Sequence, residues 1–303
     1  MRLLTRSDFD GLACGALLTY LGIVDDWKFV HPKDIQDGLV EATENDVVAN
    51  VPYINGCKLW FDHHSSEQER LGMHLENISG VSRIAPSCAR VVYDYYGGAE
   101  KLGRFASMLE YVDRIDSANL MVDEIKNPSG WVLLGFIMDP RTGLGRFKNF
   151  TISNYELMKV LAHACIDKTI DEILSLPDVK ERIDVYFKQN ELFVDMVKNH
   201  TRLDGPVIIC DLRGVETIYA GNRFLIYAMF PEQNISAWII DGKNKQNCVI
   251  SVGYSIINKT ASVDVGSLLL KYGGGGHRAV GTCQVPYEDA DRVIEEIGEI
   301  LKK

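Results

Sequence analysis

The chain has 303 residues, of which 46% are hydrophobic and 24% charged, and its formal net charge is −10 at pH 7. These values predict an ordinary soluble globular protein with two domains or one large one. The acidic balance argues against a general nucleic-acid coat protein, whose binding requires a cationic surface. An acidic enzyme can still bind phosphate if a metal ion supplies the positive charge.

The seven cysteines are scattered along the chain, form no CxxC pair and are odd in number. This pattern argues against a disulfide framework and favours a reducing compartment, so we expect a cytoplasmic protein. The first residues contain no apolar stretch as long as that of a signal peptide. No run approaches the roughly 20 apolar residues of a membrane helix, so we expect no membrane partner.

Short apolar segments alternate with helix-like segments in the first half of the chain. Strands are predicted at residues 3–4, 27–30, 46–49 and 58–61, and helices at 11–21 and 87–96. In the second of these helices, one face carries Ala89, Val92, Tyr93 and Tyr96. Strands that alternate with helices predict an α/β fold with a mostly parallel sheet flanked by helices.

A helical pattern covers residues 153–199, and Pro177 interrupts it near the start of a new helix. We expect these helices to connect two domains. After the turn-rich stretch at 203–206, strands are predicted at 207–210, 224–230, 236–240, 248–252 and 282–285, and helices at 266–272 and 289–301. The sequence therefore predicts a catalytic domain over 1–150, a helical connector over 151–203, and a smaller α+β domain over 204–303.

Acidic and imidazole side chains follow two of the predicted strands. Asp8 and Asp10 come after the first strand, and Asp62, His63 and His64 come directly after the apolar run 59–61. Open α/β sheets bind their ligands at the carboxyl ends of strands. Carboxylates with imidazoles can build a divalent-metal site. The alternatives are a helix cap for the first pair and a polar turn for the second group.

Two further groups have both a functional and a structural interpretation. Asp113 and Asp116 follow a helix-like segment, and they either add carboxylates to a metal site or belong to a solvated helix face. Arg141 and Arg146 share a loop with two glycines, which either grips phosphate or is a surface turn.

Four glycines, 273–276, precede His277 and Arg278. Successive glycines expose backbone N–H groups and allow an anion to approach closely. The imidazole and the guanidinium then add a titratable donor and a permanent cation. A flexible linker is the alternative, and the strand-like sequence that follows argues against it.

Together and in this order, these motifs resemble those of the DHH phosphoesterase superfamily. Its members include RecJ-like exonucleases, oligoribonucleases, cyclic-dinucleotide phosphodiesterases, inorganic pyrophosphatases and exopolyphosphatases. The matching motifs are DxDG at 8–11, DHH at 62–64, and GGGGH at 273–277, the last of which resembles the DHH-associated C-terminal domain. The resemblance covers nearly the whole chain, and it is specific to the superfamily and not to one substrate.

The resemblance implies a two-lobed phosphoesterase with one or two Mn²⁺ ions, or Mg²⁺, in its first lobe. Its substrate would be a short single-stranded oligonucleotide, a dinucleotide or a polyphosphate, cleaved by metal-assisted attack of water. A homodimer is also compatible with it. By motif, the metal ligands would be Asp8, Asp10, Asn50, His63 and Asp113, with Asp116 as a close rival of Asp113.

The same resemblance implies roles for the other site residues. Asp62 would orient the histidines, and His64 would contact the scissile phosphate. The arginines that could offset charge in the transition state are Arg141, Arg146 and Arg278. The substrate-binding residues of the second lobe would be Gly274, Gly275, Gly276, His277 and Arg278.

Two positions depart from the pattern of the superfamily. Arg6 and Leu4 stand where members usually place a histidine, and Asn50 stands where a metal-bridging aspartate is expected. These changes predict a weakened or single-metal centre, or an inactive homologue. Two hypotheses follow: an active phosphoesterase, and a phosphate- or nucleotide-binding protein in which an arginine beside Asp8 or Asp10 replaces the charge of a metal.

Overall fold

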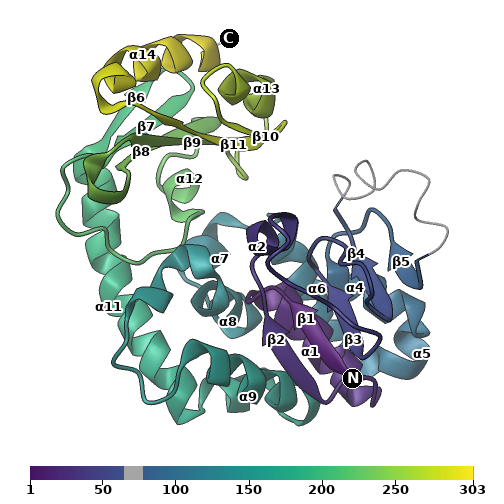
Figure 1. Cartoon of the computed structure of the whole chain (residues 1–303). Coiled ribbons are helices and arrows are strands. Elements are labelled where there is room, and N and C mark those ends of the chain that lie inside the picture. The colour runs from purple at the N-terminus through teal and green to yellow at the C-terminus, as the bar shows by residue number, and fades with distance from the viewer. Residues whose placement is uncertain (65–77, 303) are drawn as a thin grey trace. The chain divides into compact units, whose positions relative to one another are not determined.

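The computed structural model describes residues 1–64 and 78–302. The chain divides into two compact units, and each is described by itself. The N-terminal unit comprises Met1–Asn119 and Pro128–Val185, and the C-terminal unit comprises Leu120–Asn127 and Tyr186–Lys303. Helix α11 (Pro177–His200) begins at the predicted proline and belongs to both units (Figure 1). The residues predicted as a connector, 151–203, are therefore shared between the two units.

Within the described residues, the N-terminal unit contains a five-stranded sheet in the order β2-β1-β3-β4-β5. All neighbouring strands in it are parallel. The strands are β1 (Arg2–Thr5), β2 (Asp26–Phe29), β3 (Asp46–Ala49), β4 (Leu59–Asp62) and β5 (Gly80–Ser82). The predicted parallel sheet is confirmed. Strand β3 is buried throughout because a parallel sheet is covered on both faces.

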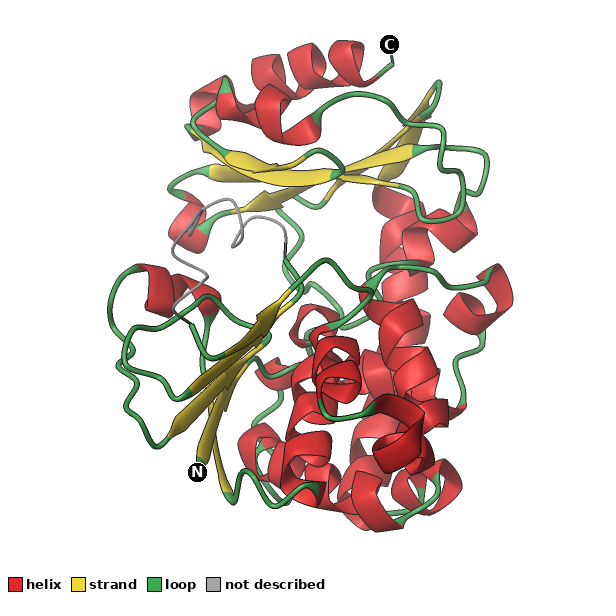
Figure 2. Cartoon of the chain, turned by 90° about the vertical axis from the view of Figure 1, so that its right-hand side faces the viewer, coloured by secondary structure: helices red, strands yellow, loops and turns green. Residues whose placement is uncertain are grey.

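Most helices of the N-terminal unit gather on one side of this sheet, and α2 (Pro32–Gln36) lies on the other (Figure 2). The other helices are α1 (Phe9–Tyr20), α4 (Cys88–Tyr95), α5 (Gly98–Leu102), α6 (Ala106–Asp116), α8 (Gly130–Met138), α9 (Asn154–Asp167) and α10 (Ile170–Leu174). Helix α1 is buried from its first residue through Leu18 because α4, α6, α8 and α9 pack around it. Helix α2 lies over a smaller core that contains Leu4, Ile35 and Trp60.

The C-terminal unit contains a six-stranded mixed sheet in the order β10-β11-β9-β8-β7-β6, as far as the described residues extend. Its strands are β6 (Thr201–Asp204), β7 (Val207–Asp211), β8 (Ile235–Asp241), β9 (Cys248–Tyr254), β10 (Gly275–His277) and β11 (Val280–Val285). Its other helices are α7 (Val122–Lys126), α12 (Leu225–Met229), α13 (Val265–Leu270) and α14 (Ala290–Leu301). The predicted smaller unit of mixed helices and strands is confirmed.

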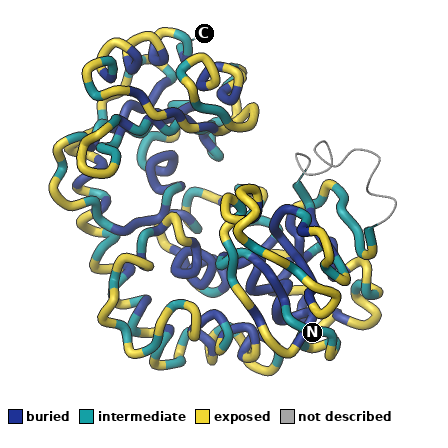
Figure 3. Tube along the Cα trace, viewed as in Figure 1, coloured by how far each residue is buried: buried dark blue, intermediate teal, exposed yellow. Residues whose placement is uncertain are grey.

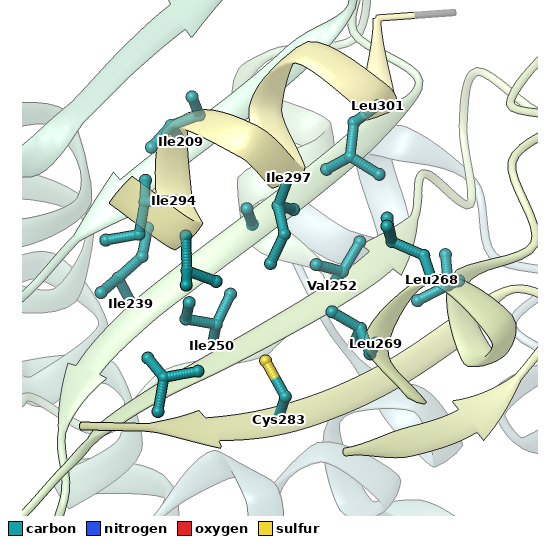
Figure 4. Packing of buried hydrophobic residues seen from close by; sticks show 14 of the residues in the cluster. Ile209, Ile239, Ile250, Val252, Leu268, Leu269, Cys283, Ile294, Ile297 and Leu301 are labelled. Atoms are coloured by element: carbon teal, nitrogen blue, oxygen red, sulfur yellow. The ribbon is translucent and has the colours of Figure 1, made fainter. Parts of the chain in front are cut away.

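The core of this unit lies between one face of its sheet and helices α13 and α14. Ile209, Ile239 and Ile250 from the sheet meet Leu269 and Ile297 from the two helices (Figure 4). Strand β11 alternates exposed and buried residues, as a strand with one covered face should. Buried residues concentrate in the interior of each unit (Figure 3). Among the described helices, none is both long and apolar enough to cross a membrane.

One predicted strand is wrong. Within the predicted strand 224–230, residues Leu225–Met229 form the short helix α12. An uninterrupted apolar run has no period that distinguishes the two structures. A local hydrogen bond favours the turn, since the side chain of Asn222 accepts from the backbone N–H of Phe224 at 2.9 Å. Strand β6 was also missed, because it lies in the stretch that the sequence marked as a turn.

Asp46 anchors the amino end of β3 and allows a test of the N-terminal unit. Its carboxylate is 1% exposed and accepts hydrogen bonds from Arg2 and Thr43. Burial raises the pKa of Asp46, but the bonds from Arg2 and Thr43 outweigh it and hold that pKa below its ordinary value of 3.8.

We expect Asp46→Ala to lower the free energy of unfolding by about 2 kcal/mol at pH 7, measured by urea denaturation. Because the folded-state pKa is lowered, this contribution is complete above pH 3.8 and is lost as the pH falls through the folded value. Asp25 pairs with the terminal ammonium but is 86% exposed, so Asp25→Ala is the matched control and should change stability by at most about 0.5 kcal/mol. Equal losses in the two variants would contradict the assignment.

Candidate metal centre

The carboxyl ends of β1, β3 and β4 lie side by side because these strands are neighbours in a parallel sheet. Asp8 and Asp10 follow β1, Asn50 follows β3, and the DHH motif begins with the last residue of β4. The chain passes from β1 to β2 on one side and returns to β3 on the other. Ligands bind open α/β sheets at such a switch point. The strand order therefore brings together two motifs that are 50 residues apart.

Asp10 is held by the first amides of helix α4. Its Oδ2 accepts from the N–H of Cys88 at 2.8 Å, and its Oδ1 accepts from the N–H of Ala89 at 2.7 Å. Burial raises the pKa of Asp10 well above its ordinary value, and the charges of Asp116 and Asp8 add to this, with the two amides only partly opposing it. The helix N-terminus places the carboxylate, but the site still lacks positive charge.

His63 presents an unsatisfied ring nitrogen to this carboxylate. Its Nδ1 lies 3.2 Å from the carbonyl oxygen of Ala85, which can only accept, so Nδ1 carries the proton. Its Nε2 lies 3.7 Å from Asp10 Oδ2 and 3.3 Å from Asp116 Oδ2, and it is buried without a hydrogen-bond partner among the described residues. When the His63 ring is neutral, the lone pair of Nε2 faces two carboxylates. This arrangement is unfavourable unless a cation lies between the ring and the carboxylates.

The ligand atoms of Asp10, His63 and Asp116 all lie within 4.8 Å of one another. Two carboxylates and one imidazole suit a divalent ion of borderline hardness, such as Mn²⁺, as well as harder Mg²⁺. Burial also raises the pKa of Asp116, as does the charge of Asp8, while His63 opposes the shift. The donor set and its missing charge therefore fit the metal ion that the superfamily implies.

Asp62 orients one histidine and not both. Its buried Oδ1 bonds His64 Nδ1 at 2.9 Å, and its Oδ2 accepts from the backbone N–H of the same residue at 3.1 Å. Burial lowers the pKa of His64, but the hydrogen bond and charge of Asp62 outweigh this effect and raise it. The expectation that Asp62 orients both histidines is corrected, since a backbone carbonyl orients His63.

Asp113, which the sequence favoured as the final ligand, does not belong to the cluster. Its Oδ1 accepts from Ser87 Oγ at 2.6 Å, and its Oδ2 pairs with Arg90 at 2.6 Å. Ser87 is the N-cap of α4, so Asp113 supports the helix that holds Asp10. Asp116 takes the place in the cluster. Both lie on α6, three residues apart, and spacing alone could not choose between them.

Asp8 has the structural role that was weighed for it. It is the N-cap of α1, since its Oδ1 accepts from the N–H of Gly11. A Cβ at Gly11 would lie 2.0 Å from the carbonyl oxygen of Arg6, so this tight entry requires glycine. The same Oδ1 accepts from Asn50 Nδ2 at 3.0 Å. Asn50 therefore donates its amide nitrogen to Asp8, and the metal-ligand role predicted for it stays a prediction.

The two loop arginines have different surroundings. Arg141 lines a cavity with Asp8, Asp10 and Asp116, and Asp139 holds its Nε at 2.8 Å. Arg146 is exposed, and among the described residues it bonds only the carbonyl oxygen of Gly143 in its own turn. The structure therefore brings Arg141 to the site and leaves Arg146 on the surface. The sequence did not predict Asp139 as a site residue, because a single aspartate before a proline has no distinctive pattern.

The glycine motif lies in the C-terminal unit. Gly275, Gly276 and His277 form β10, which pairs with β11, so a flexible linker is the wrong interpretation. A Cβ on Gly274 would lie 2.3 Å from the carbonyl oxygen of Thr282, so packing requires that glycine. His277 and Arg278 are exposed.

Comparisons with known proteins place the chain in a family. No family model and no curated protein matches the sequence. Among solved structures, a pGpG-specific phosphodiesterase, PggH from Vibrio cholerae, shares 47% identity over 98% of this chain and 97% of its own, with a TM-score of 0.88. RecJ from Thermus thermophilus, in complex with Mn²⁺, is 13% identical over 98% of this chain and 51% of its own, with a TM-score of 0.52, and shows the fold alone.

The chain belongs to the DHH phosphoesterase superfamily. The predicted superfamily is confirmed, and so is the predicted class of function, hydrolysis of a small phosphoester or phosphoanhydride substrate. A divalent-metal requirement fits the cluster of Asp10, His63 and Asp116.

The roles of Asp113 and Asp116 can be separated by binding. We expect Asp116→Asn to weaken Mn²⁺ binding by at least about 100-fold, measured by calorimetry on metal-free protein, because a ligand is lost. Asp113→Asn is the matched variant on the same helix. It should cost no more than about 10-fold, since Asp113 contacts Ser87 and Arg90 of α4 and supports Asp10 only through that helix. A larger loss in Asp113→Asn would show that the sequence preference was right.

Proposed function

We propose that this protein is a metal-dependent phosphodiesterase that hydrolyses pGpG. One water adds to the phosphodiester bond, so that each pGpG yields two GMP molecules. The observation that carries this proposal is the 47% identity, over nearly the whole of both chains, to a phosphodiesterase described as specific for pGpG. The donor cluster and the neighbouring arginine supply the chemistry that such a reaction needs.

Asp10, His63 and Asp116 would hold the divalent ion, which we propose to be Mn²⁺ or Mg²⁺. When bound, such an ion supplies Lewis-acid stabilisation of phosphoryl oxygens and acidifies water. The carbonyl oxygen of Ala85 fixes the tautomer of His63, so that its Nε2 lone pair stays directed at the cluster.

His64 is the donor that we assign to the scissile phosphate. Asp62 accepts its Nδ1–H. Burial lowers the pKa of His64, but Asp62 outweighs burial and raises that pKa, which favours the protonated ring. The remaining Nε2–H is then a charged donor. A charge-assisted hydrogen bond to a phosphoryl oxygen is about twice as strong as a neutral one. His64 therefore stabilises the extra negative charge of the transition state.

Arg141 is the second cation for the phosphate. Its backbone N–H and its Nε both bond Asp139, which anchors the side chain at the wall of the cavity. The two terminal nitrogens of an anchored guanidinium can bind two phosphate oxygens at once. We assign substrate binding in the C-terminal unit to His277, Arg278 and the preceding glycines. The homodimer and the cytoplasmic location stay predictions.

The non-catalytic hypothesis also has an observation in its favour. Arg6 Nε lies 3.1 Å from Asp8 Oδ2, so one carboxylate of the DxDG motif is paired with a side chain. A protein that only bound pGpG could use such a fixed cation in place of a metal. The cluster at His63 weighs against this, because its lone pair lacks a partner among the described residues.

Turnover of pGpG decides between the two. We expect the purified chain to convert pGpG to GMP in the presence of Mn²⁺ and to lose this activity on removal of the ion with EDTA, as followed by liquid chromatography. His63→Ala should lower the rate by at least about 100-fold, because it removes a ligand of the cluster. Tight binding of pGpG without any GMP, in Mn²⁺ and in Mg²⁺, would establish the binding protein instead.

The two loop arginines offer a matched pair of variants. Arg141→Ala should lower kcat/KM for pGpG by about 100- to 1,000-fold, the usual effect of losing one donor to a transition-state oxyanion. Arg146→Ala removes the same charge five residues away and should change kcat/KM by less than about threefold, because Arg146 is exposed and is not one of the residues that line the cavity. Similar losses in the two variants would mean that the loop acts through its general charge.

A further inference from the structure

Asp8 is a buried carboxylate, and each of its two oxygens already has a polar partner. Oδ1 accepts from the N–H of Gly11 at 2.9 Å and from Asn50 Nδ2 at 3.0 Å, and Oδ2 lies 3.1 Å from Arg6 Nε. Its side chain is 9% exposed. The Arg6 guanidinium offsets the charge of this carboxylate, and two N–H groups donate to its Oδ1, without a metal ion.

Asn50 is fixed in this arrangement by its backbone. It adopts the left-handed region, with φ of +59°, which asparagine tolerates better than most residues. Its backbone N–H donates to the carbonyl oxygen of Phe61 at 3.1 Å, and its side chain is buried. Because an ionised Asp8 can only accept, the amide must present its nitrogen. A carboxylate at this position would face Asp8 with a like charge and would require a cation between the two.

The neighbouring cluster of Asp10, His63 and Asp116, in contrast to Asp8, lacks a compensating cation among the described residues. The ring of His63 is 10% exposed, and its Nε2 faces Asp10 and Asp116 without a hydrogen-bond partner in the described part of the chain. The amides of α4 hold Asp10 but bring no full positive charge. The lone pair of His63 Nε2 beside two carboxylates therefore indicates a binding site for a cation. At Asp8, by contrast, the Arg6 guanidinium is already the cation.

We infer that this chain binds one divalent ion, held by Asp10, His63 and Asp116, and that the Arg6 guanidinium takes the place of a second ion beside Asp8. Charge supports this stoichiometry. The carboxylates of Asp8, Asp10 and Asp116 carry three negative charges, of which Arg6 offsets one. A single divalent ion neutralises the other two.

Arg141 does not alter the count, because Asp139 pairs with it at 2.8 Å. A guanidinium is a permanent cation, but it has no site for a water ligand, so Arg6 would fix charge and position without activating water. The inference rests on the metal-dependent function proposed above. Its stoichiometry is nevertheless measured without substrate and can fail independently of pGpG hydrolysis.

The test is the number of Mn²⁺ ions per chain and their magnetic state. Metal-free full-length protein is titrated with Mn²⁺ by calorimetry, and the loaded protein is examined by electron paramagnetic resonance. We expect one ion per chain and the six-line spectrum of isolated Mn²⁺. Two tight ions in the wild-type chain, or the spectrum of a spin-coupled pair, would overturn the inference whatever the activity.

A double variant tests whether Arg6 and Asn50 are the reason. Arg6→Ala with Asn50→Asp removes the fixed cation and turns an amide donor into a carboxylate. We expect this variant to take up a second Mn²⁺ and to show the coupled spectrum. A folded double variant that still binds one ion would overturn the role given to Arg6.

Arg2→Ala is the matched control. It removes an arginine at the amino end of β1 that pairs with Asp46 of β3, and it should leave the stoichiometry at one ion. Circular dichroism establishes that each variant is folded. If the double variant does not fold, the single variants Arg6→Ala and Asn50→Asp answer the question. Each single variant should bind a second Mn²⁺ ion more tightly than the wild-type chain does. If both variants still bind one ion as the wild type does, the role of Arg6 is overturned.

Discussion

The site depends on one buried carboxylate, Asp10, held by the first amides of helix α4. Burial of an ionised carboxylate is costly unless hydrogen bonds and opposite charge compensate it. Two backbone amides provide the hydrogen bonds. They leave the charge uncompensated, as the raised pKa of the Asp10 carboxyl shows, with burial as its main cause. The need for a cation is therefore built into the fold.

Much of the surrounding structure serves to keep α4 in place. Its N-cap, Ser87, donates to Asp113, and Arg90 in its first turn pairs with the same carboxylate. Thus an aspartate outside the metal cluster still determines its geometry. The other carboxylate of the DxDG motif is treated differently, because Asp8 caps α1 and pairs with Arg6. Two aspartates of one motif therefore differ in their partners: Asp8 is paired with a cationic side chain, whereas Asp10 accepts from neutral backbone amides.

The same distinction appears in the two histidines of the DHH motif. A backbone carbonyl leaves the Nε2 of His63 facing the carboxylates, whereas Asp62 bonds the Nδ1 of His64 and raises the pKa of that ring. Neighbouring imidazoles can differ in this way because each has one nitrogen fixed by a different partner. In the loop after α8, Asp139 does the same for Arg141 by holding its Nε.

The sequence by itself determined the parallel sheet, the two motifs at the ends of its strands, and the superfamily. Apolar alternation and the local spacing of acidic and imidazole groups are properties of short segments, so they can be recognised without coordinates. Tertiary structure alone decided between Asp113 and Asp116, between Arg141 and Arg146, and between helix and strand at 224–230. These choices depend on which groups from distant segments meet in three dimensions. Asn50 shows this most clearly, since only the approach of β1 and β3 makes it a partner of Asp8, which Arg6 contacts from two residues away in the same segment.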